Sequence, residues 1–368
     1  MIPVCEPFLS GKELEYVSDC IRSNWISSQG KYIQEFEQSF ARYCGCQYGI
    51  STTSGTTALH LALASLGIGT GDEVIIPAFT MIATAFAVAY TGAKPVLVDA
   101  EPETWNMDSS QIEARITRRT KAIMPVHIYG HPCDMDPILE IARKHHLWVI
   151  EDAAEAHGAE YKGKKAGGIG DVNCFSFYAN KIITTGEGGM VVTNNADAAE
   201  RARTLKDLAH SREKRFLHTD IAFNYRMTNL QAAIGLAQFE KIDDLVERRR
   251  AHAYLYNGLL KDIEGIVLPP EREWAKNVYW MYGILLEDSF GPSRDELMER
   301  LKKQGIDTRA FFIPIHQQSA FQKENLFQGE SYPIAEKISQ EGLYLPSGSG
   351  LSSEQIEYVC QVIKDSRK

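Results

Sequence analysis

The chain has 368 residues, of which 44% are hydrophobic and 24% charged, and its formal net charge is −9 at pH 7. A chain of this length is too long to form only one small hydrophobic core, so we expect two domains. The acidic balance argues against binding of bulk nucleic acid, and no uncharged apolar run is long enough to predict a membrane-spanning helix. Seven cysteines are scattered along the chain, and only Cys44 and Cys46 stand close together. We therefore expect reduced structural thiols and no metal site.

The N-terminal segment begins MIPVCEPFLSGKE and has no basic region followed by an apolar stretch. This pattern predicts a cytoplasmic protein without a secretory signal. A first helix is expected from Ser10, with Glu13 as the partner of a capping box. Leu14, Val17 and Ile21 follow at helical spacing, which supports that helix.

Short apolar runs then alternate with helical segments. Strands are predicted over residues 72–79, 94–100, 121–128 and 146–154, and helices over 56–66 and 134–145. Buried strands that alternate with helices indicate a mostly parallel sheet with helices on both faces, which is an α/β fold. In such sheets, ligands bind at the carboxyl ends of the strands.

The pattern changes near residue 245. One or two long charged helices are predicted over 232–256, followed by a strand over 280–286, a helix over 293–304 and a proline-punctuated stretch over 311–316. We therefore predict a large domain over residues 1–245 and a smaller C-terminal α+β domain over residues 246–368.

Lys181 stands in the run SFYANKIITTGEGG, residues 176–189. A lysine amine that loses its proton can form a Schiff base with a carbonyl group. The apolar and aromatic residues 172–178 before it predict partial enclosure, and the glycine-rich turn after it lets backbone approach a bound group closely. A lone lysine at a strand-to-turn junction is usually structural, so this interpretation depends on partners elsewhere in the chain.

Ser54 and Gly55 precede an apolar helix in the segment TTSGTTALHLAL, residues 52–63. Backbone N–H groups at a helix start, together with hydroxyl groups, form an anion site. Ser176, five residues before Lys181, could add a hydroxyl to the same site. Taken singly, a capped helix and a strand serine would explain these residues equally well.

Asp152 closes the predicted strand that ends in VIED. Pyridoxal phosphate (PLP) needs an acidic partner for its ring nitrogen so that the ring can act as an electron sink. Glu155 follows in the same turn and could reach the same ligand. Either carboxylate alone could instead cap a loop or remain solvated. A helix-start phosphate site, a strand-end carboxylate, a serine and a lysine follow in the order expected of a PLP enzyme with a parallel sheet.

These segments resemble the nucleotide-sugar aminotransferase family of fold type I PLP enzymes. The resemblance covers essentially the whole chain and includes WISSQGKYIQEFE (25–37), GDEVIIPAFT (71–80), PVHIYGHPCDM (125–135), IEDAAEAHGA (150–159), NYRMTNLQAAIG (224–235) and FFIPIH (311–316). Relatives that dehydrate rather than transaminate carry histidine at the lysine position, so Lys181 favours transamination. The resemblance implies a large PLP-binding domain and a smaller C-terminal domain.

The resemblance also implies roles around the cofactor ring. Lys181 would bind PLP as a Schiff base and move protons, Asp152 would pair with the pyridinium nitrogen, and Glu155 would approach the ring hydroxyl. Many relatives place an aromatic residue that stacks on the ring where this chain has Met81. A thioether can pack against an aromatic face, and Phe79 could compensate.

The resemblance implies a homodimer whose active sites are shared between subunits. The cofactor phosphate would be held by Ser54, Gly55, Thr56 and Ser176 of one subunit and by Asn224 of its partner. Ser27 and His316 lie in segments that would line the sugar side. A loop hydroxyl and a histidine after a proline turn are the structural alternatives for these two residues.

The implied reaction moves an amino group from L-glutamate to a nucleotide-linked 4-keto-6-deoxy sugar, for surface polysaccharide (O-antigen) synthesis. The cofactor would cycle through pyridoxamine phosphate. GDP-4-keto-6-deoxy-D-mannose is the favoured substrate, and a UDP- or dTDP-linked sugar aminated at C3 or C4 is the alternative. A PLP-binding regulator is a non-enzyme alternative, against which Lys181, Asp152 and Ser176 argue. A dinucleotide-binding enzyme is disfavoured because no GxGxxG motif follows the first strand.

Overall fold

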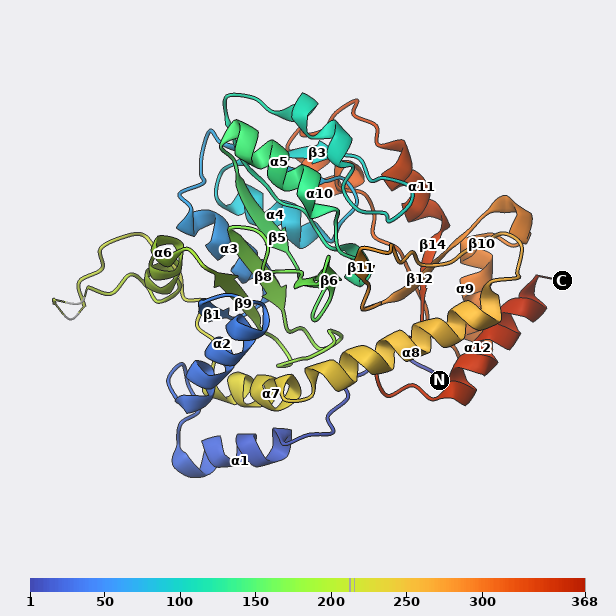
Figure 1. Ribbon diagram of the computed structural model, residues 1–368, viewed down its shortest axis with the longest axis horizontal. Helices are drawn as coiled ribbons and strands as arrows, with labels where there is room; N and C mark the ends of the chain where they lie inside the picture. Colours follow the sequence, from blue (N-terminus) through green and yellow to red (C-terminus); the bar gives the residue numbers. More distant parts are fainter. Residues whose placement is uncertain (212, 215, 368) are drawn as a thin grey trace.

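The computed structural model describes residues 1–211, 213–214 and 216–367. Its largest unit is a seven-stranded sheet at the centre of Figure 1. In sheet order, the strands are β1 (Tyr48–Thr52), β9 (Gly189–Thr193), β8 (Val172–Ser176), β5 (Trp148–Asp152), β4 (Thr120–Ile123), β2 (Glu73–Pro77) and β3 (Lys94–Val98). Neighbours from β8 to β3 run parallel, whereas β9 is antiparallel to β1 and β8. The predicted α/β fold with a mostly parallel sheet is confirmed.

Helices cover both faces of this sheet. They are α2 (Lys31–Tyr43), α3 (Gly55–Ser65), α4 (Ile82–Tyr90), α5 (Met135–His145), α6 (Ala196–Lys206) and α7 (Asn229–Phe239), with α1 (Glu13–Ser23) packed on α7. The β2–α4–β3 and β4–α5–β5 connections run in opposite directions across the sheet, so right-handed crossovers put α4 and α5 on opposite faces. Accordingly, Ile75 of β2 packs in a cluster with Ile138 of α5, and Ile76 packs in the cluster that contains Val88 of α4.

The C-terminal part builds a second, antiparallel sheet in the order β10 (Ile266–Val267), β12 (Tyr282–Leu286), β14 (Gly342–Leu345) and β13 (Arg309–Ala310). Its helices are α8 (Ile242–Leu260), α9 (Arg294–Lys303), α10 (Ser319–Lys323), α11 (Pro333–Glu341) and α12 (Ser353–Ser366). The long helix α8 runs from α7 toward α9 and α12 (Figure 1). Tyr256 of α8, Leu297 of α9 and Ile356 of α12 share one buried core.

A small three-stranded sheet joins the two parts of the chain. Its strands are β11 (Ala275–Lys276), β6 (Glu160–Tyr161) and β7 (Lys164–Lys165). The first residues also pack on the C-terminal part, since the N–H of Ile2 donates to the carbonyl of Gly305 (2.7 Å) and Ser347 donates to Val4 (2.9 Å). A domain division near residue 245 stays a prediction, and it would lie inside α8.

The first helix begins later than predicted. It starts at Glu13, and its N-cap residue makes no side-chain cap hydrogen bond. Glu13 instead accepts a hydrogen bond from Nε2 of Gln238 in α7 (2.5 Å), and the hydroxyl of Ser10 accepts one from Lys241 (3.3 Å). The predicted capping box of Ser10 and Glu13 is therefore wrong, because both side chains are used in tertiary contacts.

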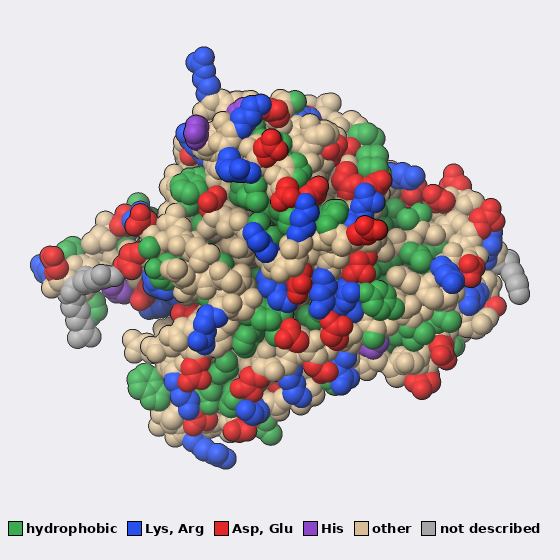
Figure 2. Space-filling view, viewed as in Figure 1, with side chains coloured by type: hydrophobic (Ala, Val, Ile, Leu, Met, Phe, Trp, Pro, Cys, Tyr) green, Lys and Arg blue, Asp and Glu red, His purple; other side chains and the backbone are tan. Residues whose placement is uncertain are grey.

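Charged side chains of both signs are interspersed over the face that Figure 2 shows. No single-sign patch dominates that face, in agreement with a formal net charge of only −9 on 368 residues. In the described ranges, no helix has the length and apolarity needed to cross a membrane.

Candidate active site

A cavity of about 300 Å³ opens at the carboxyl ends of β5 and β8, where an open α/β sheet is expected to bind ligands. Its walls come from the start of α3, the start of α4, the loop after β5, the loop between β8 and β9, and the segment before β12. The predicted site residues that line it are Ser54, Gly55, Thr56, Met81, Asp152, Glu155, Ser176 and Lys181. The fold thus brings together residues that are up to 127 positions apart, from Ser54 to Lys181.

The start of α3 forms one wall. Ser54 is the N-cap, its hydroxyl accepts a hydrogen bond from the N–H of Thr57 (3.2 Å), and the Thr57 hydroxyl accepts from the N–H of Ser54 (2.9 Å). Gly55 lies so close to β8 that a Cβ on this residue would stand 2.6 Å from the Cβ of Ser176. The helix start therefore lies directly beside the Ser176 hydroxyl, which creates a wall suited to a phosphate group.

Asp152 ends β5 and is only 4% exposed. Its Oδ2 accepts a hydrogen bond from the Thr84 hydroxyl (2.8 Å), and its Oδ1 accepts one from the N–H of Ala154 (3.2 Å). Burial raises the pKa of this carboxyl, and the Thr84 hydrogen bond acts in the opposite direction. The arrangement presents an oriented carboxylate to the cavity.

Glu155 is held by the backbone of the loop between β4 and α5. Its Oε2 accepts a hydrogen bond from the N–H of Tyr129 (2.7 Å), a residue in the left-handed region at φ 54°. The Tyr129 ring packs against Phe311 and Tyr344, with ring centres 4.7 and 5.1 Å away. Burial raises the pKa of Glu155, and the charge of Lys181 opposes this. This buried aromatic cluster therefore fixes the backbone that orients Glu155.

Lys181 lies in the loop between β8 and β9, and its side chain is 9% exposed. Its Nζ lies 3.9 Å from Oε1 of Glu155 and 3.4 Å from the centre of the Trp280 ring. Burial lowers the pKa of this amine, although attraction to Glu155 and Asp152 acts in the opposite direction. The neutral, nucleophilic form of Lys181 is therefore more populated near neutral pH than that of an ordinary lysine.

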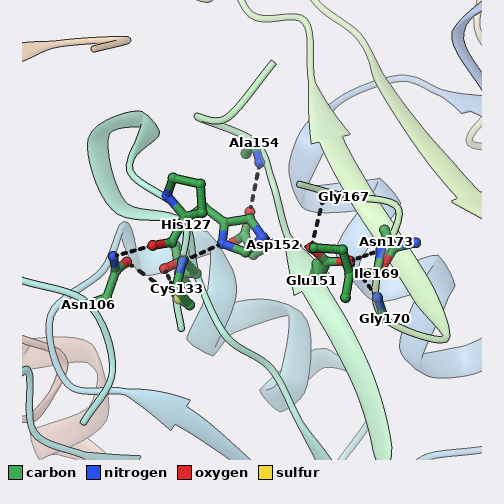
Figure 3. Close-up of polar contacts among 12 residues, drawn as sticks. Asn106, His127, Cys133, Glu151, Asp152, Ala154, Gly167, Ile169, Gly170 and Asn173 are labelled. Atoms are coloured by element: carbon green, nitrogen blue, oxygen red, sulfur yellow. Dashed lines mark hydrogen bonds and ion pairs between the residues drawn. The ribbon is translucent and has the colours of Figure 1, made fainter. Parts of the chain in front are cut away.

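A buried polar network supports the end of β5 from behind (Figure 3). The carboxylate of Glu151 accepts hydrogen bonds from Nε2 of His127 (2.7 Å) and from the N–H groups of residues 167, 169 and 170 (2.7, 2.6 and 2.5 Å). Nδ1 of His127 accepts from the N–H of Cys133 (3.0 Å), which leaves Nε2 as the donor to Glu151. The N–H of His127 in turn donates to the carbonyl of Asp152 (3.1 Å), which anchors the residue that faces the cavity.

Three predicted site residues lie outside this cavity. Asn224 is exposed, and its Oδ1 accepts a hydrogen bond from Nε of Arg226 (2.9 Å). Ser27 is exposed in the loop between α1 and α2. His316 pairs with Glu336 (Nε2 to Oε1, 3.0 Å) and borders a separate cavity. The sugar-side roles of Ser27 and His316 and the partner-subunit role of Asn224 stay predictions.

Several residues that line the cavity or support it are not indicated by the sequence motifs. Trp280 begins a predicted strand, yet its Nε1 donates to the carbonyl of Asn180 (2.9 Å) beside Lys181. A single tryptophan has no periodic pattern that could have indicated this. Thr80 and Thr84 did carry a usable pattern, since residues four apart at a helix start lie on one face.

The residues of the cavity fit PLP. Hydroxyl and N–H groups suited to a phosphate, a buried carboxylate suited to a ring nitrogen, and a lysine amine suited to a carbonyl all line the same space. A Cβ at Gly55 would close the gap between α3 and Ser176, so the glycine preserves the approach that the phosphate wall requires. Together, the fold and this cavity define a PLP-dependent enzyme of fold type I.

The chain belongs to the DegT/DnrJ/EryC1/StrS aminotransferase family, whose profile matches residues 7–364. It is 48% identical over 359 residues to GDP-perosamine synthase of Caulobacter vibrioides (97% of this chain, 96% of that protein). It is 47% identical over 365 residues to GDP-perosamine synthase of Escherichia coli O157:H7 (99% and 98%). A Streptococcus pneumoniae protein proposed to be a sugar aminotransferase, solved in its PLP form, is 28% identical with a TM-score of 0.93 (100% and 98%). The predicted family, fold type, aminotransferase class and PLP cofactor are confirmed.

Proposed function

We propose that this chain transfers the amino group of L-glutamate to C4 of GDP-4-keto-6-deoxy-D-mannose and so forms GDP-perosamine. The observation that carries the proposal is the buried Lys181 amine in one cavity with Asp152 and a phosphate-type wall. The identity of the sugar rests on the two relatives named GDP-perosamine synthase, which match nearly the full length of the chain. The same proposal includes a cytoplasmic location and a role in surface polysaccharide (O-antigen) synthesis.

The side chains of the cavity have distinct tasks in this reaction. PLP, when bound, supplies an electron sink for bond breaking at the carbon that carries the amine. Asp152 would keep the ring nitrogen protonated, and Nζ of Lys181 would accept and return the proton at the reacting carbon. Glu155, 3.9 Å from that Nζ, would balance the charge of the amine when it holds the proton. Ser54, Gly55, Thr56 and Ser176 would bind the phosphate.

We also propose a homodimer with shared sites. Large apolar side chains are exposed on the isolated chain, among them Leu14 (81%) and Ile21 (61%) on α1 and Ile221 (97%) between α6 and α7. Residues 207–211 and 216–223, between α6 and α7, extend away from the body of the molecule (Figure 1). Exposed apolar side chains of this size are typical of interaction surfaces, and a second copy would cover them. Asn224 lies at the base of this projection, paired with Asp207, and could then reach the phosphate wall of the partner.

Two alternative functions predict different experimental results. A UDP- or dTDP-linked keto sugar, aminated at C3 or C4, would use the same cofactor chemistry with another nucleotide site. A regulatory homologue would bind PLP without turnover. The intact set of Lys181, Asp152 and Ser176 in one cavity favours an enzyme over a regulator.

The test compares GDP-, UDP- and dTDP-linked 4-keto-6-deoxy sugars side by side, each with L-glutamate and the purified holoenzyme. We expect the GDP sugar to give the highest kcat/KM and a 4-amino sugar by mass spectrometry and NMR. A preference for UDP or dTDP would contradict the nucleotide, and a 3-amino product would contradict the position. If L-glutamate leaves the cofactor spectrum unchanged, the aminotransferase proposal fails and the regulatory alternative is favoured.

A further inference from the structure

Thr80 and Thr84 form a short chain of hydroxyl groups that ends on Asp152. The two Oγ1 atoms lie 3.0 Å apart, and Oγ1 of Thr84 lies 2.8 Å from Oδ2 of Asp152. Both threonines are buried, Thr84 in the first turn of α4 and Thr80 four residues earlier on the cavity wall. The hydroxyl chain thus runs from the surface of the cavity to the carboxylate.

Donation along this chain has one direction. An ionised carboxylate can only accept hydrogen bonds, so the Thr84 hydroxyl must donate to Asp152. The Thr84 oxygen then accepts from the Thr80 hydroxyl. Because Oδ1 of Asp152 is held separately by the N–H of Ala154 (3.2 Å), each carboxylate oxygen has its own donor. Two donors on two oxygens define the rotation of the carboxylate about its last bond.

We propose that Thr84 is a positioning residue that fixes the orientation and the ionised state of Asp152, with Thr80 orienting Thr84. This inference rests on the proposed function in one respect, since it assumes that Asp152 serves the cofactor ring. Without the hydroxyl, Oδ2 would lose the donor that the buried Thr84 side chain supplies. The carboxylate would then be less strongly held, both in orientation and in charge.

Among the groups around Asp152, Thr84 contributes most to keeping the carboxylate ionised. The ionisable groups that face Asp152 are Lys181, His127, Glu155 and Cys174. Burial raises the pKa of Asp152, and the Thr84 hydrogen bond is the largest of the influences that lower it, ahead of the Ala154 N–H and the charge of Lys181. Loss of the hydroxyl should therefore raise this pKa further.

Three variants distinguish the effect of the Thr84 hydroxyl from the effect of the side-chain shape. Thr84→Val keeps the shape and removes the hydroxyl, and Thr84→Ser keeps the hydroxyl. Thr91→Val is a matched control, because Thr91 caps the other end of α4 and its hydroxyl donates to the carbonyl of Val88 (2.8 Å), outside the cavity lining. The readout is ¹³C NMR titration of labelled aspartate carboxyls in the protein without cofactor, with Asp152→Asn to identify the resonance.

We expect Thr84→Val to raise the pKa of Asp152, and Thr84→Ser and Thr91→Val to leave the titration as in the wild type. In the reconstituted enzyme, Thr84→Val should lower the pH at which the bound ring nitrogen loses its proton and reduce kcat about tenfold. An unchanged titration in Thr84→Val, or an equal shift in Thr84→Ser, would overturn the proposal.

If Thr84→Val does not fold, a second variant still tests the proposal. Thr80→Val removes the first hydroxyl of the pair, so it should raise the pKa of Asp152 by a smaller amount than Thr84→Val. An unchanged titration in Thr80→Val would overturn the proposed role of Thr80. The inference and the proposed function can fail separately. If Thr84→Val shifts the carboxyl but Asp152→Asn keeps normal turnover, the positioning stands and the role of Asp152 in the reaction is wrong.

Discussion

At the scale of single residues, burial decides the chemistry of the cavity. The motifs around Lys181, Asp152 and Glu155 identified these residues because family patterns fix their types and order. The balance of effects on the pKa of Lys181 could not be predicted, since it depends on burial and on contacts such as Glu155, whose Oε1 lies 3.9 Å from Nζ of Lys181. The spacing of Thr80 and Thr84 indicates that they share one helix face, but it does not indicate that Thr84 contacts Asp152, because that carboxylate lies 68 residues further along the chain.

The first prediction concerns the pH dependence of Lys181. Burial lowers the pKa of this amine and Glu155 raises it, so Glu155→Gln should lower it further and make Lys181 reactive at lower pH. Competitive amine labelling of the protein without cofactor, followed by peptide mapping, measures this midpoint, with the surface lysines of the same sample as an internal reference. A midpoint that moves upward in Glu155→Gln would mean that Glu155 does not act on the amine.

The second prediction concerns Asp152. Asp152→Asn should still bind PLP but lose turnover by at least about 100-fold, because an amide cannot keep the ring nitrogen protonated. Absorbance titration with PLP measures binding, and single-turnover kinetics with L-glutamate measure the chemical step. Near-normal turnover would show that Asp152 is only a structural cap at the end of β5.

At the scale of elements, the sequence predicted four of the seven strands of the central sheet. The four apolar runs became β2, β3, β4 and β5, because buried parallel strands are continuously hydrophobic. The two-residue strands β6, β7, β10, β11 and β13 could not be predicted, since so few residues carry no periodicity. The capping box at Ser10 failed because Gln238 and Lys241, far along the chain, compete for its side chains.

The third prediction concerns the packing of α3 on β8. Gly55→Ala would put a Cβ 2.6 Å from that of Ser176, so the start of α3 must shift away from β8 and distort the phosphate wall. We expect a loss of about 1–3 kcal/mol in the free energy of unfolding and weaker PLP binding. Gly258→Ala in α8 is the control, because a Cβ there meets nothing within 4 Å, and it should stabilise the protein slightly. Equal PLP affinity in both variants would contradict the proposed wall.

At the scale of the whole molecule, one chain holds the cavity but leaves Asn224 outside it. The sequence alone could indicate this only through the family resemblance, because contacts between subunits have no local pattern. The exposed apolar side chains of α1 and of the segment before α7 agree with a surface that a second copy covers.

The fourth prediction tests shared sites by complementation. Lys181→Ala and a bulky Asn224→Trp should each be nearly inactive as homodimers. In a mixed dimer, one site would carry both changes and the other neither, so co-refolding should restore about half of the wild-type activity per mixed dimer. Different affinity tags on the two chains isolate the mixed dimer. If it forms and remains inactive, Asn224 acts within its own subunit and the shared-site proposal is wrong.

The central claim is that Lys181 carries the cofactor chemistry of the cavity. The most direct measurement is borohydride reduction of the reconstituted enzyme, followed by proteolysis and mass spectrometry, with Lys181→Ala as the control. The account predicts one pyridoxyl group per chain on the peptide that contains Lys181, and no such group in the variant, which should keep its fold but lose turnover. A pyridoxyl group on another lysine of the wild type, or none at all, would contradict it.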